Sequence, residues 1–206
     1  CAVCAGQEQW LSYRYHREAR SIMPYSGGRG EEASHDKPSD VKLPTFESES
    51  PVFYKWETPM AKSGSIWMAL DNSHKYGPHN KLYVDSNCNG HLDDEDAIEA
   101  YQMDQHYGHF GPVRIIFDTD EGPITYHLNV EHYAYRDSDS EYIYIYPGCW
   151  YEGQITVEGE KKKCVVMDSN LNGTFNDKGM NDQDRIQIGE KGAQEPAFVG
   201  NYIEVN

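Results

Sequence analysis

Apolar and polar residues alternate along most of the chain from residue 51 onward. The run Glu141–Tyr146 places isoleucines on one face and tyrosines on the other, which is the period of two typical of a β-strand. Glu158-Gly159 separates two further alternating runs and predicts a hairpin turn. The pattern predicts strands at Val52–Trp56, Ser65–Leu70, Lys81–Val84, Val113–Phe117, Ile124–Tyr135, Glu141–Tyr146, Tyr151–Val157, Lys162–Met167, Arg185–Ile188 and Asn201–Val205. These lengths and turns predict a mainly β fold, an antiparallel β-sandwich or a barrel-like body.

One short segment has helical spacing instead. Ile98 and Tyr101 would share a helix face, and Asp93 or Asp94 could cap its start. We therefore expect a short helix at Asp94–Met103.

Residues 1–50 differ in composition from the rest and predict an extended N-terminal arm and linker, followed by a β domain at 51–206. Leu11, Tyr13 and Tyr15 alternate with polar residues, so residues 9–16 are expected to form a strand. Residues 22–50 are rich in glycine, serine, proline and acidic residues, as linkers are. The strand could pair with another copy of the chain or fold back onto its own domain.

The segment Leu82–Asp96 has the residue types of a calcium loop. Such loops supply oxygen ligands from positions 1, 3, 5, 7, 9 and 12 and carry glycine at position 6. Counted from the first aspartate, the ligands are Asp85, Asn87, Asn89, the backbone carbonyl of His91, Asp93 and Asp96, with Gly90 at the turn.

The same Asp-Ser-Asn-x-Asn-Gly pattern recurs at Cys164–Asp177. Its ligands would be Asp168, Asn170, Asn172, Thr174 and Asn176, with Gly173 at the turn. Position 12 is Gly179, so the closing carboxylate must come from Asp177, Asp182 or Asp184. The duplication favours two Ca²⁺ sites over two asparagine-glycine turns between strands, which is the alternative. It also suggests that residues 51–117 and 124–188 are diverged halves.

At these positions the first loop resembles the dockerin type of EF-hand-like loop, which ends in Asp rather than Glu. In this chain each loop follows a predicted strand rather than a helix, so the resemblance covers the loops alone. The second half is also similar to secreted bacterial β-proteins that place such a loop after a hairpin. This likeness implies calcium binding and carries no activity with it.

Charge and composition limit the partners. The formal net charge is −16, which argues against nucleic acid and anionic membranes. No apolar stretch approaches the length of a membrane-spanning helix, so no membrane insertion is expected. An acidic, calcium-loaded protein suits an extracellular or cell-surface location. The five cysteines leave one thiol over, and Cys1 could carry a lipid.

The chemistry-bearing residues show no catalytic pattern. The nine histidines lack zinc-type spacing, and there is no nucleophile elbow or phosphate loop. We therefore expect a protein that is not an enzyme: a calcium-stabilised structural subunit that forms a homopolymer, such as a fibre, through residues 9–16. The alternatives are a secreted carbohydrate-binding module that uses the tyrosine-rich strand face, or a glycoside hydrolase with an unrecognised carboxylate pair.

Overall fold

The computed structural model describes residues 9–23, 27–73, 78–134, 140–177, 184–190 and 195–200. Within these ranges the chain forms strands and a single turn of 3₁₀ helix, η1 (Ala19–Ser21). The strands are β1 (Ser12–Tyr15), β2 (Arg29–Glu32), β3 (Val52–Glu57), β4 (Ser65–Asp71), β5 (Lys81–Val84), β6 (Ile98–Glu99), β7 (Gln102–Met103), β8 (Tyr107–Thr119), β9 (Gly122–Ala134), β10 (Glu141–Pro147), β11 (Cys149–Val157), β12 (Glu160–Met167), β13 (Arg185–Ile188) and β14 (Ala197–Phe198).

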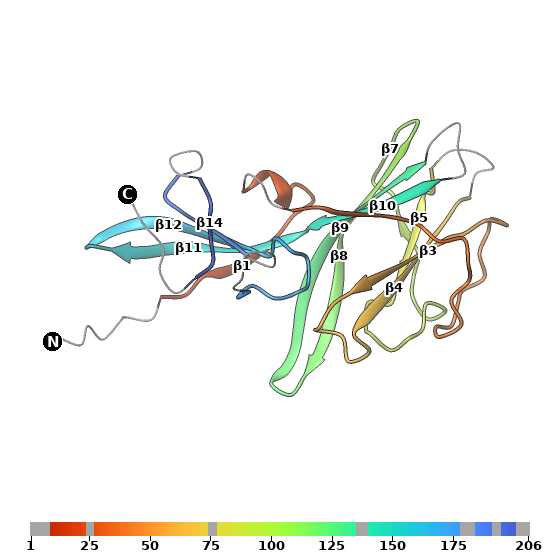
Figure 1. The fold of residues 1–206 in the computed structure, drawn as a ribbon, viewed down its shortest axis with the longest axis horizontal. Coiled ribbons are helices and arrows are strands. Elements are labelled where there is room, and N and C mark those ends of the chain that lie inside the picture. Colours follow the sequence, from red (N-terminus) through yellow and green to blue (C-terminus); the bar gives the residue numbers. More distant parts are fainter. Residues whose placement is uncertain are drawn as a thin grey trace.

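The strands form three antiparallel sheets (Figure 1). The central sheet has the order β2-β10-β9-β8-β7, and the lateral sheet has the order β3-β4-β5-β6. The third, here called the distal sheet, has the order β1-β11-β12-β13-β14 and projects away from the other two. None of the three closes into a barrel within the described part of the chain.

The main core lies between the central and lateral sheets, as the alternation of residues dictates. Each strand contributes its apolar positions, so that Trp56 and Met68 of the lateral sheet pack in one cluster with Phe117 and Ile145 of the central sheet. The prediction of a mainly β fold built from antiparallel sheets is confirmed, and the two sheets that face each other across this cluster are arranged like a sandwich.

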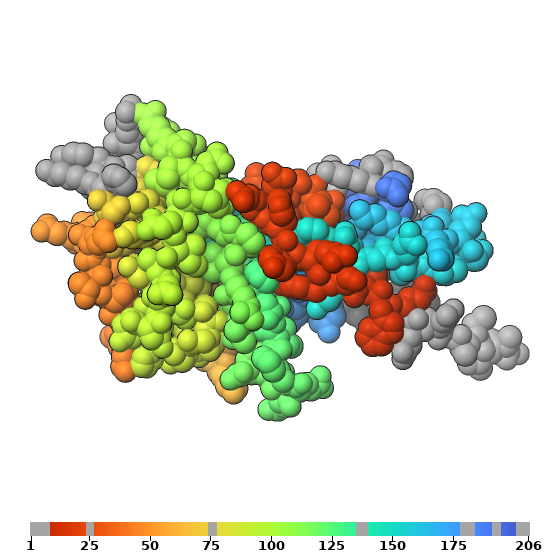
Figure 2. All heavy atoms as spheres, turned by 180° about the vertical axis from the view of Figure 1, so that it is seen from behind, coloured from red at the N-terminus to blue at the C-terminus, as the bar shows by residue number. Residues whose placement is uncertain are grey.

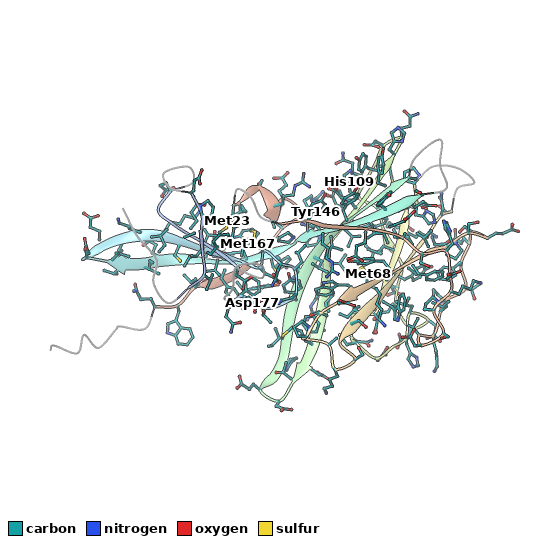
Figure 3. The ribbon with its side chains drawn as sticks, in the orientation of Figure 1. Met23, Met68, His109, Tyr146, Met167 and Asp177 are labelled. Atoms are coloured by element: carbon teal, nitrogen blue, oxygen red, sulfur yellow. The ribbon has the colours of Figure 1, made fainter. Side chains whose placement is uncertain are left out.

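A second, smaller core secures the N-terminal segment to the distal sheet. Ala19 and Met23 are buried against Trp150, Val165 and Met167. Figure 3 shows Met23 and Met167 side by side, and Figure 2 shows residues 9–23 lying across the junction of the central and distal sheets.

Residues 12–15 pair with the chain's own β11, from Ser12 opposite Glu152 to Tyr15 opposite Cys149. The Tyr13 hydroxyl lies 2.9 Å from Nδ1 of the buried His127, and the Tyr15 ring stacks on the same imidazole. In the single chain the strand therefore folds back onto its own body, which is one of the two alternatives that the sequence left open.

The predicted linker is fastened to the body at several points. β2 pairs with β10 at the edge of the central sheet, and Ser34 exchanges two backbone hydrogen bonds with Phe53. Asp71, which is fully buried, accepts hydrogen bonds from the backbone N–H groups of Glu47 and Ser48. These bonds order a polar segment whose composition alone would leave it mobile.

The helix predicted at Asp94–Met103 is wrong. Ile98 instead pairs with Leu82 of β5, and the N–H of Tyr101 donates to the carbonyl of His109. Backbone pairing with neighbouring strands therefore outweighs a weak helical spacing in this segment. Among the described residues, no helix is long or apolar enough to cross a membrane.

The predicted strands from Val52 to Ile188 are all present, while the strand predicted at residues 201–205 lies outside the described residues. β8 and β9 are longer than expected, and the short β2, β6, β7 and β14 were not predicted. Each calcium-type loop joins two antiparallel neighbours, β5 to β6 and β12 to β13. Each of the two proposed halves, residues 51–117 and 124–188, therefore contains this strand-loop-strand unit.

Candidate metal centres

The first loop is a tight turn built around Asp85. Its carboxylate accepts hydrogen bonds from the backbone N–H groups of Asn89 (2.8 Å) and Gly90 (2.9 Å). The side-chain oxygen of Asn87 accepts from the N–H of Asn89, and that of Asn89 accepts from the N–H of His91. The side-chain oxygens of positions 1, 3 and 5 therefore all turn inward.

The second loop repeats this arrangement around Asp168. The carboxylate accepts from the N–H groups of Leu171 (2.7 Å) and Gly173 (2.8 Å). The side-chain oxygen of Asn170 accepts from the N–H of Asn172, and that of Asn172 accepts from the N–H of Thr174.

The backbones of the two loops also match. Position 4 is left-handed in both, with φ of 59° at Cys88 and at Leu171. Position 6 is left-handed in both, with φ of 79° at Gly90 and 93° at Gly173. Residues other than glycine seldom adopt positive φ, so the same unusual conformation at two sites marks one type of turn that occurs twice rather than two unrelated turns.

A carboxylate at position 10 closes each loop. For the first loop, the sequence pattern instead predicts Asp96 at position 12. Asp94 accepts a hydrogen bond from the side-chain amide of Asn89. Asp177 accepts from the side chains of Asn170, Asn172 and Thr174, at 3.1, 2.6 and 2.7 Å. Asp177 was among the predicted closing ligands, whereas Asp94 was missed because it lies within a run of four acidic residues.

The other predicted ligands either make no hydrogen bond to the loop that the structure gives or fall outside the described part. Asp93 and Asp96 are exposed, and Asp93 lies beside the imidazole of His91. Asn176 is exposed, and Asp182 falls outside the described residues.

A second acidic residue accepts a hydrogen bond from the backbone N–H at position 2 of each loop. Glu95 accepts from the N–H of Ser86 at 2.7 Å, and Asp184 accepts from the N–H of Ser169 at 3.2 Å. Asp184 also accepts from the N–H of Asp177, so it ties the two ends of the second loop together. Glu95 was not predicted, because only the fold shows that it corresponds to Asp184.

The second loop concentrates negative charge away from water. Asp168 and Asp184 are fully buried. Burial raises the pKa of Asp168 to about 6, although hydrogen bonds from Tyr126 and three backbone N–H groups oppose it. Burial and the nearby charge of Asp168 raise the pKa of Asp184 to about 7. A divalent cation would stabilise the ionised form of both carboxylates.

The donor atoms of both loops fit calcium. Carboxylate, amide and hydroxyl oxygens converge on each turn, and hard cations prefer such ligands. When bound, the ion would supply charge neutralisation rather than chemistry. In the first loop the residues to hold it are Asp85, Asn87, Asn89 and Asp94, and in the second they are Asp168, Asn170, Asn172 and Asp177.

The second loop also bridges the sheets. The indole N–H of Trp56 donates to the carbonyl of Leu171 at 2.7 Å, and the hydroxyl of Thr58 donates to the carbonyl of Asn172. The hydroxyl of Tyr126 donates to Asp168 at 2.8 Å, and Leu171 is buried in the main core. The loop thereby connects β3, β9 and the distal sheet, and Figure 3 shows Asp177 at this junction.

A different cluster, which the sequence did not reveal, joins His79, His132 and Glu141. Their ligand atoms lie within 4.8 Å of one another, close enough to hold a metal. His132 pairs across strands with Ile143, and its side chain is fully buried.

The hydrogen bonds of this cluster argue against a metal. The backbone N–H of His79 donates to Nδ1 of His132 at 3.0 Å, so the ring proton must lie on Nε2. Nε2 then donates to Glu141 at 2.6 Å and has no lone pair for a metal. Although burial opposes it, the hydrogen bond from His132 and the adjacent His79 ring, whose Nδ1 lies 3.2 Å from the carboxylate, hold the pKa of Glu141 well below its usual range. The cluster is thus a buried hydrogen-bonding network that connects residue 79 to β9 and β10.

The cysteines of the described chain form no disulfide. Cys88, Cys149 and Cys164 are free thiols, and Cys149 and Cys164 are buried.

Comparison of the chain with protein-family models, with curated proteins and with solved structures gave no match.

Proposed function

We propose that this chain is an extracellular or cell-surface structural protein whose fold is stabilised by two Ca²⁺ ions. The observation that carries the proposal is the repeated loop: the same two left-handed positions, the same inward asparagine oxygens and the same closing carboxylate at position 10. The resemblance to dockerin-type loops, stated on sequence alone, supports the same ligand. Both loops join strands of the body, so the ions serve stability and not catalysis.

The first loop also contacts the segment that links β2 to β3. The N–H of Lys42 donates to the carbonyl of Gly90, and the N–H of Leu92 donates to the carbonyl of Lys42. Val41 and Leu43 pack against Leu92, which is fully buried. An ion in this loop would therefore also fix the segment that links β2 to β3.

Chelation tests this function. Removing Ca²⁺ should lower stability by about 2.7 kcal/mol for each site held at 100 times its dissociation constant. The measurement is urea denaturation with calcium and with chelator. An unchanged midpoint would refute the proposal.

The proposal includes self-assembly through the N-terminal strand. β1 is an edge strand, and Trp10 beside it is 83% exposed. If β1 leaves its own sheet, it can make the same contacts with β11, His127 and Tyr151 of a neighbouring copy. Such an exchange between identical chains gives a dimer if it closes and a fibre if it does not.

Cross-linking between differently marked copies tests this exchange. Ser12 lies opposite Glu152, so a Ser12→Cys chain mixed with a Glu152→Cys chain can form a disulfide across that register only between copies. A mixture of Ser12→Cys with Lys62→Cys is the matched control. We expect covalent dimers in the first mixture under calcium. Equal yields in both mixtures, or a strictly monomeric wild type, would reject assembly through β1.

A further inference from the structure

The outer side of the central sheet carries a row of tyrosines. Tyr142, Tyr144 and Tyr146 alternate along β10 with Ile143 and Ile145, which are fully buried in the main core. The tyrosines therefore point to the opposite side, where each is partly exposed. Tyr133 of β9 lies opposite Tyr142, and Tyr107 of β8 lies opposite Tyr133. These five residues, Tyr107, Tyr133, Tyr142, Tyr144 and Tyr146, are here called the aromatic face.

The rings of β10 lie side by side. The ring centroids of Tyr142 and Tyr144 are 6.4 Å apart, and those of Tyr144 and Tyr146 are 6.5 Å apart with planes only 13° from parallel. Tyr107 and Tyr133 continue the row across the sheet with centroids 4.5 Å apart. The five rings therefore occupy adjacent positions on three neighbouring strands rather than standing as isolated side chains.

Two glycines of the preceding segment keep the rings in place. A Cβ at Gly30 would collide with the ring of Tyr144, and one at Gly28 would collide with the ring of Tyr146. Gly30 lies directly opposite Tyr144 in the β2–β10 pairing. The missing side chains let both rings lean over the edge strand.

Charged and hydrogen-bonding side chains lie among the rings of this face. Glu131 lies opposite both Tyr144 and His109, and its carboxylate is 3.3 Å from Nδ1 of His109. Arg20 lies over the Tyr146 ring at 4.5 Å and is 3.9 Å from Glu131. Figure 3 shows Tyr146 and His109 on the same side of the sheet.

We propose that the aromatic face is a binding site for a neutral polysaccharide. The apolar ring faces of sugars stack on aromatic rings, while their hydroxyls need donors and acceptors nearby, and Glu131, Arg20 and the tyrosine hydroxyls supply them. A polyanionic glycan would be repelled by the net charge of −16. None of these residues belongs to a calcium-type loop, so the site is independent of the proposed metal function.

Affinity electrophoresis through gels that contain one soluble neutral polysaccharide each, such as hydroxyethylcellulose, xylan or galactomannan, tests the site. We expect at least one gel to retard the wild type. Tyr144→Ala should reduce the retardation at least fivefold because it removes a stacking ring. Tyr146→Ala should also reduce it at least fivefold, because it removes the ring over which Arg20 is held beside the face. Tyr144→Phe should retain most of it, since the ring is kept. Phe198→Ala, which truncates another exposed aromatic residue on β14, is the matched control and should bind as the wild type does.

Thermal melting of every variant separates loss of binding from loss of fold. The proposal is overturned if no neutral polysaccharide retards the folded protein, or if the two alanine variants remain folded and bind as the wild type does. It is equally overturned if size-exclusion chromatography shows that the same variants abolish a dimer, because the face would then be a protein interface.

Discussion

Gly173 is the residue at which the second loop meets β3. Its φ is +93°, and a Cβ there would lie 2.9 Å from Cγ of Met60 and 3.2 Å from the Thr58 hydroxyl. We expect Gly173→Ala to lower the free energy of unfolding by about 1 kcal/mol through backbone strain, and by a further 1–3 kcal/mol through overpacking. Gly159→Ala, with φ of +85° and open space around the Cβ, should show the strain alone. If urea denaturation shows the same loss of unfolding free energy for both variants, the overpacking against Met60 and Thr58 is contradicted.

His127 predicts a pH dependence at the position that receives the N-terminal strand. Burial, assisted by the charge of Arg114, lowers its pKa to about 4, against about 6.5 in the unfolded chain. The unfolded state thus binds more protons between pH 6.5 and 4, so stability present above pH 6.5 is lost as the pH falls through this window. The loss from this residue is at most roughly 3 kcal/mol. His127→Gln should flatten the stability profile measured from pH 7 to 4, and a profile identical to that of the wild type would contradict this assignment.

At the scale of elements, β3 and the second loop should behave as one unit. The Thr58 hydroxyl donates to the carbonyl of Asn172, so Thr58→Val would leave a partly buried acceptor unpaired at a cost of about 1–3 kcal/mol. The same change should weaken calcium binding to the second loop, because the loop is held in its binding conformation in part by this bond. Thr156→Val on the exposed hairpin of β11 is the control. Calorimetric titration that finds unchanged affinity at both sites would show that the loop is organised without β3.

The elements that the sequence predicted well are those whose signal is local. Alternating runs such as Glu141–Tyr146 and the turn at Glu158-Gly159 each carry their own period or turn chemistry, and the hairpins followed from them. The helix at residues 94–103 failed because only Leu82, distant in sequence, decides that Ile98 is a strand residue. β2 was missed because Arg29–Glu32 contains no apolar residue; Gly30 is required there by the ring of Tyr144.

The residues of the candidate sites likewise fall into those with a local sequence signal and those that only the fold brings together. Asp85 and Asp168 were found from loop spacing, since the ligands at positions 1, 3 and 5 are fixed by the turn itself. Asp94 and Asp177 close the loops, and Glu95 and Asp184 accept from the N–H at position 2 of each. These contacts depend on the fold, and a run of acidic residues gives no local signal for choosing among them. The cluster of His79, His132 and Glu141 joins three separate segments, so no spacing could reveal it.

At the scale of the molecule, two sheets share the main core, and the distal sheet is joined to them through β1 and the second loop. Trp56, Tyr126 and Leu171 meet at this junction. If calcium organises the second loop, its removal should loosen the distal sheet more than the sandwich. Hydrogen exchange with chelator should therefore increase first in β12 and β13. Uniform exchange across all three sheets would contradict this order.

The count of calcium ions bound per chain tests the central claim most directly. Equilibrium dialysis followed by elemental analysis should find two ions in the wild type and in Asp93→Asn, whose exposed carboxylate lies beside the imidazole of His91. Asp85→Asn and Asp168→Asn should each leave one ion, because each removes the carboxylate around which a loop turns. A wild type that retains no calcium, or loop variants that retain two ions, would contradict the account.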